Sequence, residues 1–175
     1  MTCATDLAYY RLMTRWAASF LLVIVGLAGF VASAQVAQDS AGKKFSVADL
    51  QKLKWIEGTW RGTGDVEAPF FERYRFENET TLVVDSFTDE TLTKLEDTTR
   101  FELRDGQFGN GGEGARWSAT AIDYQGVTFE PMVRARNSFR WQRESDKTWT
   151  AILKWPAAEG KLGRQRIYKM ERWPK

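Results

Sequence analysis

A run of alternating glycines around one tryptophan constrains the fold of this chain more than any other stretch. Every second residue from 58 to 64 belongs to it: Gly58, Trp60, Gly62 and Gly64. In an extended strand all four lie on one face. Glycine inside a strand marks a sharp bend or a close approach of a neighbouring segment. One large indole among glycines therefore predicts a strand that closes the end of a β-barrel.

Turn signals divide the residues that follow into short segments with the composition of strands. Asp105-Gly106 is a strong hairpin signal, and the glycine-rich segment 107–114 is predicted to be a loop. Nine or ten closely spaced strands predict an all-β fold, namely a single antiparallel up-and-down barrel. The expected strands are 59–66, 70–77, 81–88, 91–104, 115–124, 127–132, 138–144, 148–155 and 162–173.

A short helix is predicted just before the first of these strands. Ser46 and Asp49 have the spacing of a capping box, with Asp in place of Glu. Leu50, Leu53 and Ile56 would form its apolar stripe. We expect this helix to plug one end of the barrel.

The first 34 residues have the pattern of a secretory signal peptide. Arg11 and Arg15 precede an apolar run over 17–30, and an A-x-A cleavage motif ends at Ala34. Cleavage there would place the mature protein in the bacterial periplasm or outside the cell, with no membrane span left. An uncleaved anchor is the alternative, and Met13 is an alternative start. The expected parts are a signal peptide (1–34), a flexible leader (35–45) and the barrel (46–175).

Composition excludes several kinds of chemistry. The chain has 175 residues, which suits one domain, and it contains no histidine. The absence of histidine excludes His-based triads, His metal ligands and His-ligated haem. The only cysteine, Cys3, lies in the predicted signal peptide. A formal net charge of +2 does not indicate a nucleic-acid partner. We therefore predict no catalytic residue, metal or cofactor.

The start of the first strand also resembles a known superfamily. Gly58-x-Trp60 after a short helix resembles the opening signature of the calycins, which include lipocalins, fatty-acid-binding proteins and nitrobindin-like barrels. The longer pattern through Gly62 and Gly64 is most similar to nitrobindin-like and exported bacterial lipocalin-like proteins. The resemblance implies a barrel that holds one small ligand.

The last predicted strand carries two candidate groups on one face. Arg166-Ile167-Tyr168 resembles the Arg-x-Tyr pair with which fatty-acid-binding proteins help to hold a ligand carboxylate. A guanidinium and a phenol together offer three donors to such a group. The calycin resemblance also implies that an arginine of this strand packs over Trp60 and closes the barrel. Arg164 and Arg172 are the candidates for closure.

Further candidates lie on earlier strands. Glu72 and Tyr74 share a face, and an inward Glu72 would be a buried carboxylate that needs a partner. Such a partner would make it either a packing device or the polar end of a pocket. Arg140 would line a mouth or the interior, although a solvated outer face is the alternative. Trp141 and Trp149 would supply aromatic walls.

Together these features predict an exported, non-enzymatic protein that binds a small apolar or amphipathic molecule, including one with a carboxylate. Two alternatives stay open. One is a nitrobindin-like, haem-related enzyme, which the absence of histidine disfavours. The other is a structural or interaction barrel with a filled interior. The candidate ligand-binding residues are Arg166, Tyr168, Glu72, Tyr74, Arg140, Trp141 and Trp149.

Overall fold

The computed structural model describes residues 43–64, 68–111, 114–158, 160 and 162–174. The predicted signal peptide and most of the predicted leader lie outside these residues. The helix α2 (Val47–Gln51) and the 3-10 helix η2 (Lys54–Ile56) come first. The strands are β1 (Gly58–Thr63), β2 (Phe70–Asn78), β3 (Thr81–Phe87), β4 (Leu95–Arg104), β5 (Gln107–Asn110), β6 (Arg116–Asp123), β7 (Gly126–Val133), β8 (Ser138–Arg143), β9 (Thr148–Trp155) and β10 (Arg164–Arg172).

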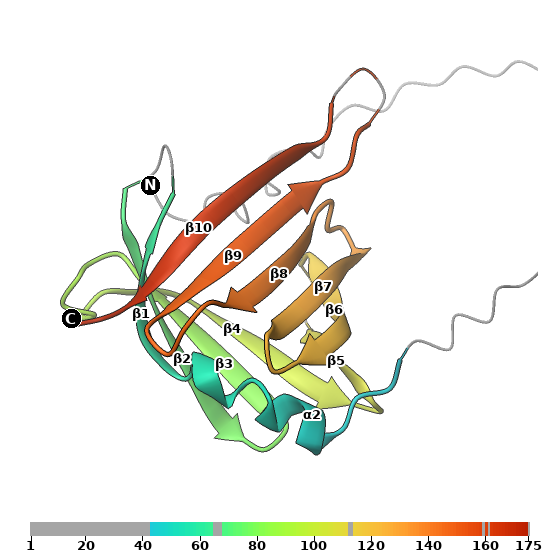
Figure 1. Cartoon of the computed structure of the whole chain (residues 1–175), viewed down its shortest axis with the longest axis horizontal. Coiled ribbons are helices and arrows are strands. Elements are labelled where there is room, and N and C mark those ends of the chain that lie inside the picture. The colour runs from blue at the N-terminus through green and yellow to red at the C-terminus, as the bar shows by residue number, and fades with distance from the viewer. Residues whose placement is uncertain (1–42, 65–67, 112–113, 159, 161, 175) are drawn as a thin grey trace, which may run out of the picture.

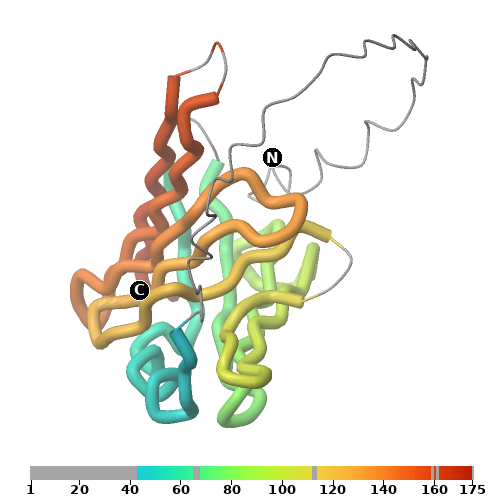
Figure 2. Tube along the Cα trace, turned by 90° about the vertical axis from the view of Figure 1, so that its right-hand side faces the viewer, coloured from blue at the N-terminus to red at the C-terminus, as the bar shows by residue number. Residues whose placement is uncertain are grey.

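The strands form one closed antiparallel barrel (Figure 1). Each strand pairs with its neighbours in sequence, and β1 pairs with β10 to close the ring. The prediction of an all-β, up-and-down antiparallel barrel with a short N-terminal helix is therefore confirmed. Figures 1 and 2 show the β9–β10 hairpin reaching beyond the other strands, at the end of the barrel opposite α2. We call the α2 end the closed end and the opposite end the open end.

Several boundaries differ from the sequence-based prediction. Residues 107–110 form β5 instead of a loop, and the Asn110 side chain makes the turn into β6 by bonding to the backbone of Ala115 and Trp117. β4 begins at Leu95 rather than at 91 because the Asp89 carboxylate accepts backbone hydrogen bonds from the turn before it. β10 begins at Arg164 rather than at 162. β7 runs through Pro131, as the predicted strand 127–132 does, and its pairing with β6 shifts register there.

Hydrogen bonds organise the start of α2. The backbone and the hydroxyl of Ser46 both donate to the Asp49 carboxylate at 2.9 Å, and Lys52 donates to it at 2.7 Å. The bond from Lys52, followed by those from Ser46, lowers the pKa of Asp49 to about 2. The apolar stripe of the two helices is buried in the barrel core, and it consists of Leu50, Leu53 and Ile56. No helix in the described part of the chain is long and apolar enough to span a membrane.

The glycine run of β1 allows the barrel wall to pack closely. Gly62 is paired with Phe70 on β2, and the Phe70 ring lies directly above it. A β-carbon at Gly62 would lie 2.1 Å from that ring, so only glycine leaves room for the ring. The close approach expected from the alternating glycines is thus present at this position.

Candidate functional site at the open end

The closed end is sealed by an arginine of the last strand. The Arg172 guanidinium lies 4.1 Å from the Trp60 ring centroid, and it donates hydrogen bonds to the carbonyl oxygens of Glu57 and Trp55. At Gly58, with φ of 124°, a β-carbon would lie 1.8 Å from the guanidinium. Glycine is therefore needed here both for the backbone conformation and for the arginine. Trp60 and Arg172 are placed as the closure interpretation requires.

Arg164, the other closure candidate, lies elsewhere. Its guanidinium is 4.2 Å from the centroid of the Trp155 ring, and these two residues are paired at the open end of β9 and β10. Arg164 and Arg172 share a face of β10 but stand eight residues apart, so they reach opposite ends of the barrel. The prediction that Arg164 packs on Trp60 is therefore wrong.

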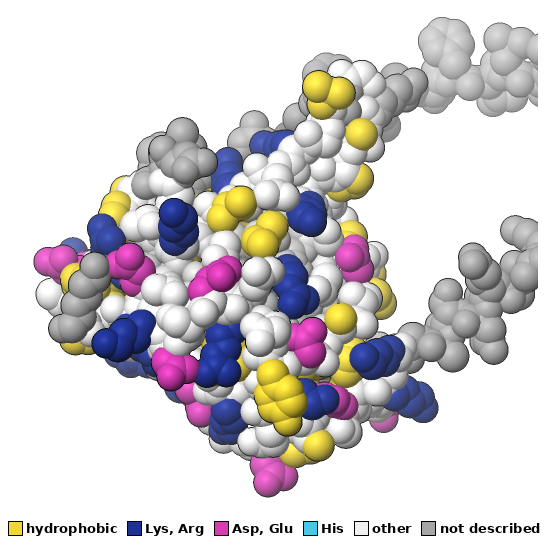
Figure 3. Space-filling model, in the orientation of Figure 1, with side chains coloured by type: hydrophobic (Ala, Val, Ile, Leu, Met, Phe, Trp, Pro, Cys, Tyr) yellow, Lys and Arg dark blue, Asp and Glu magenta, His cyan; other side chains and the backbone are white. Residues whose placement is uncertain are grey.

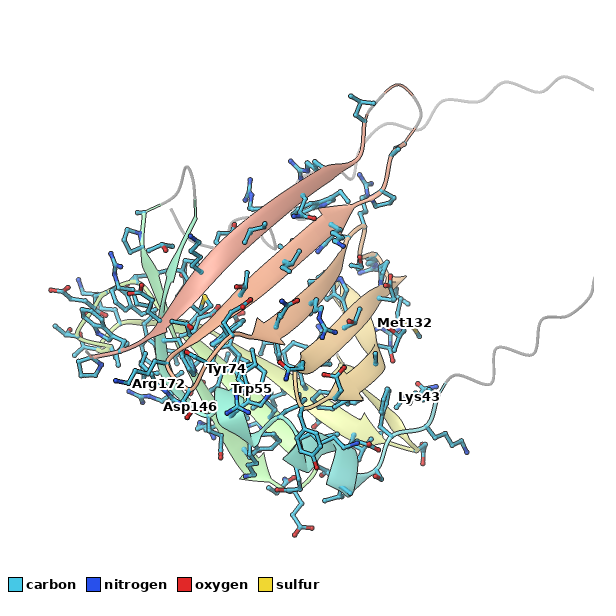
Figure 4. All side chains as sticks on the ribbon, viewed as in Figure 1. Lys43, Trp55, Tyr74, Met132, Asp146 and Arg172 are labelled. Atoms are coloured by element: carbon cyan, nitrogen blue, oxygen red, sulfur yellow. The ribbon has the colours of Figure 1, made fainter. Side chains whose placement is uncertain are left out.

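Aromatic rings fill the closed half of the interior. The Tyr74 ring stands edge-on to both Trp141 and Trp149, with centroids 5.5 Å apart in each pair. Trp149 in turn stands edge-on to Trp60 at 6.0 Å. Figure 4 labels Tyr74 near the helices, together with Trp55 and Arg172. Trp141 and Trp149 thus pack against other rings and form the core beneath the candidate site rather than an accessible wall.

The open half differs, because its inner-face apolar residues remain partly exposed. Phe139 and Leu153 are paired across β8 and β9, and Phe139 is also paired with the fully buried Phe129. Paired residues point to the same face of a sheet, so these side chains line the interior. Their partial exposure shows that solvent reaches the inner wall at this end. At this end the partly exposed inner-face apolar residues are Trp117, Phe139, Leu153 and Trp155, and nearer the closed end Phe76 and Leu103 are partly exposed as well.

A carboxyl group lies on this inner surface. Glu72 is paired with Trp60 on β1 and with Ser86 on β3, so its side chain points into the barrel. Tyr74 donates its hydroxyl proton to the Glu72 carboxylate at 2.6 Å. Burial raises the pKa of Glu72, against the opposing effect of hydrogen bonds from Tyr74 and Ser86. Glu72 nevertheless keeps part of its surface accessible, which places it at the edge of the solvent-accessible region.

A second polar pair belongs to β10. Arg166 donates a hydrogen bond to the Tyr168 hydroxyl at 3.0 Å. The Tyr168 ring is buried and stands edge-on to Phe70, with centroids 5.4 Å apart. Arg166 is only half-buried and is paired with the inner-face Leu153. The structure therefore brings Arg166 and Tyr168 together on one wall, and Glu72 and Tyr74 together on another.

Arg140 does not belong to this surface. It lies between the inner-face residues Phe139 and Trp141, so its own side chain points outward. There it donates to the Thr128 hydroxyl at 3.0 Å. The prediction that Arg140 lines the interior is wrong, and the solvated outer face is the correct alternative.

A depression of about 580 Å³ borders the rim at the open end. Outer-face residues form part of it, and the stacked pair Arg164 and Trp155 forms another part. Lys, Arg, Asp and Glu side chains are interspersed over the face in Figure 3, without a single basic block. The depression is lined by Glu130, Pro131, Ser138, Lys154, Trp155, Pro156, Ala157, Gly163, Arg164 and Gln165.

Sequence reasoning missed several members of the inner surface. Ser86 and Asp97 are paired on β3 and β4, and Ser86 is also paired with Glu72. Phe139 and Leu153 were not singled out either. Alternation with Trp141 and Trp149 along the same strands was the available signal, because residues two apart share a face.

Comparison with known proteins gives little further information. The sequence matches no protein-family model and no curated protein. Among solved structures, the structure of EF1p2_mFAP2b bound to DFHBI is similar with a TM-score of 0.36 and 9% sequence identity. The similarity covers 69% of this chain and 96% of that chain. At this TM-score, the likeness does not bear on the function of the chain.

Proposed function

We propose that the protein binds one small apolar or amphipathic molecule on the inner surface of its open end, as a binding protein rather than an enzyme. One observation carries the proposal: packed rings fill the interior at the closed end, whereas a group of four apolar inner-face residues, three of them aromatic, remains partly exposed to solvent at the open end. Apolar surface inside a rigid wall favours ligand binding, because covering it releases water without reorganising the protein.

The expected affinity is moderate. A small aromatic ligand that removes about 250 Å² of apolar surface from water gains about 6 kcal/mol at about 25 cal/mol per Å². This gain corresponds to a dissociation constant of the order of tens of micromolar. Loss of the ligand's own freedom weakens binding, and polar contacts with the inner-face groups strengthen it. Glu72 and Tyr74 on β2 and Arg166 and Tyr168 on β10 are the groups proposed to make such contacts.

We further propose that the barrel is of the calycin type and that the protein is exported after removal of residues 1–34. The closure contact of Arg172 with Trp60, the plug formed by α2 and the Gly58-x-Trp60 start of β1 support the first part. The signal-peptide pattern supports the second. The mature protein would then act in the periplasm or outside the cell.

Isothermal titration calorimetry with the neutral probe 2-(1-naphthyl)ethanol tests the proposed binding site. The purified protein should bind this probe with a micromolar dissociation constant. Leu153→Trp replaces a branched aliphatic side chain on the inner wall by a bulkier indole and should weaken binding at least tenfold. Ile167→Trp is the matched control, because Ile167 is an exposed residue on the outer face of β10, and it should leave the affinity unchanged.

Two results would overturn the proposal. One is no binding by the wild-type protein. The other is equal weakening by the inner and the outer tryptophan, because the probe would then bind outside the barrel. A structural barrel with a filled interior is the second candidate, and the ring packing of Trp141 and Trp149 at the closed end favours it. Absence of binding would support that candidate.

A further inference from the structure

The Glu72 carboxyl has unused capacity to accept hydrogen bonds. An ionised carboxylate offers about four acceptor positions. The hydroxyls of Tyr74 and Ser86 occupy two of them. Glu72 points into the barrel and is not fully buried as a residue, and a group that enters from the open end would complete its remaining positions.

No cation balances this carboxyl within the described residues. None of their lysines or arginines lies within ion-pairing distance of Glu72, and the donors that reach it are neutral hydroxyls. Keeping a partly buried carboxylate without a counter-charge costs stability. The inner-face groups around it are Phe70 and Tyr74 from β2, Trp60 from β1, Ser86 from β3, Asp97 from β4 beyond Ser86, and Arg172 from β10 beyond Trp60, whose guanidinium lies over the Trp60 ring.

Aromatic rings flank the carboxyl on its own strand. Phe70 and Tyr74 are each two residues from Glu72 and share its face of β2. A cation beside Glu72 would therefore lie between two aromatic side chains, and Tyr74 meets the carboxylate with its hydroxyl while its ring packs against Trp141 and Trp149. A carboxylate together with neighbouring rings is a combination that suits an ammonium group better than it suits an anion.

We infer that the ligand carries an amine, which docks on Glu72 as an ammonium ion while its apolar part covers the inner-face rings of the open end. This inference rests on the proposed function and specifies the chemical class of the ligand. The ammonium supplies both the missing donors and the missing positive charge. Non-specific attraction at long range would not favour an amine, because the whole chain has a formal net charge of +2 and so repels cations at a distance.

Three probes with one naphthalene body test the inference by titration calorimetry at pH 7.5. They are 2-(1-naphthyl)ethylamine, 2-(1-naphthyl)ethanol and 1-naphthylacetate. The amine should bind at least tenfold more tightly than the alcohol, because only the amine pairs with the carboxylate. Glu72→Gln should abolish this preference, because the neutral amide does not pair with the ammonium ion.

Glu77→Gln is the matched control. It removes a carboxylate from the same strand, but Glu77 is exposed and pairs with Arg75 and Arg100. Its probe affinities should equal those of the wild type. The comparison of amine and alcohol in the wild-type protein needs no variant. It therefore tests the preference for an ammonium group even if Glu72→Gln does not fold.

The possible outcomes separate the two proposals. Binding of the alcohol without a preference for the amine overturns the inference and leaves the proposed function intact. Tightest binding of 1-naphthylacetate, lost in Arg166→Gln, also overturns the inference, because the polar anchor would then lie on β10. Failure of all three probes to bind overturns the proposed function and the inference with it.

Discussion

Replacing Arg172 by methionine tests whether the closed end depends on the arginine contacts. Arg172→Met removes the cation–π contact with Trp60 and the hydrogen bonds to the carbonyls of Glu57 and Trp55. The first contributes about 1 kcal/mol. A hydrogen bond from a charged donor contributes about 1.5–3 kcal/mol, and the 3.3 Å bond to Trp55 contributes less than the bond to Glu57. After methionine recovers some packing on the indole, the expected loss is about 3–4 kcal/mol.

The assay is thermal and urea unfolding followed by circular dichroism. At about 4 °C per kcal/mol for a domain of this size, the unfolding temperature should fall by about 12–16 °C. Arg164→Met is the control, because Arg164 also stacks on a tryptophan, at 4.2 Å, but is exposed. The control should cost about 1 kcal/mol or less. Equal losses of unfolding free energy in the two variants would show that the hydrogen bonds of Arg172 to the carbonyls of Glu57 and Trp55 do not add to the stability.

Three further perturbations test other parts of the structure. Gly62→Ala puts a methyl group against the Phe70 ring and should lower the free energy of unfolding by about 1–3 kcal/mol, measured in urea. Gly111→Ala, which has open space around it, should change that free energy by no more than about 0.5 kcal/mol. Equal effects of the two substitutions would contradict the close packing of Phe70 on Gly62. Because hydrogen bonds lower the pKa of Asp49 to about 2 from 3.8, its contribution is present above pH 4 and is lost as the pH falls toward 2. In Asp49→Asn the urea midpoint should depend less on pH between about 4 and 2 than in the wild type. An equal pH dependence in the two proteins would contradict the assignment. Burial raises the pKa of Glu72, so its destabilising effect grows as the pH rises. Glu72→Gln should therefore raise the urea midpoint more at pH 8 than at pH 4, and the opposite order would contradict the pKa direction.

The local signals in the sequence predicted most of the architecture. Asp105-Gly106 predicted a hairpin, and both residues have positive φ in the turn between β4 and β5. The apolar spacing of Leu50, Leu53 and Ile56 predicted the buried helical stripe. Such signals are readable because turn conformation and helical periodicity depend on residues close together in the chain.

The candidate site was predictable only in part. Glu72 and Tyr74 share a face by simple alternation, and the structure joins them by a hydrogen bond. Asn110, by contrast, carries an amide whose hydrogen bonds to the backbone of Ala115 and Trp117 connect β5 to β6 where a loop was predicted. No local pattern showed this, because the partners of that amide are set by how two strands meet.

The sequence by itself determined which side chains of a strand lie together on one face, and where the chain turns. Only the tertiary structure decided which face is the interior and which end of the barrel each residue reaches. Arg140 and Trp141 differ by one position, and strand pairing places the first outside and the second in the core. Arg164 and Arg172 share a face but contact different tryptophans at opposite ends. The physical reason is that side chains alternate with a period of two, whereas inward direction and depth depend on pairing between strands distant in sequence.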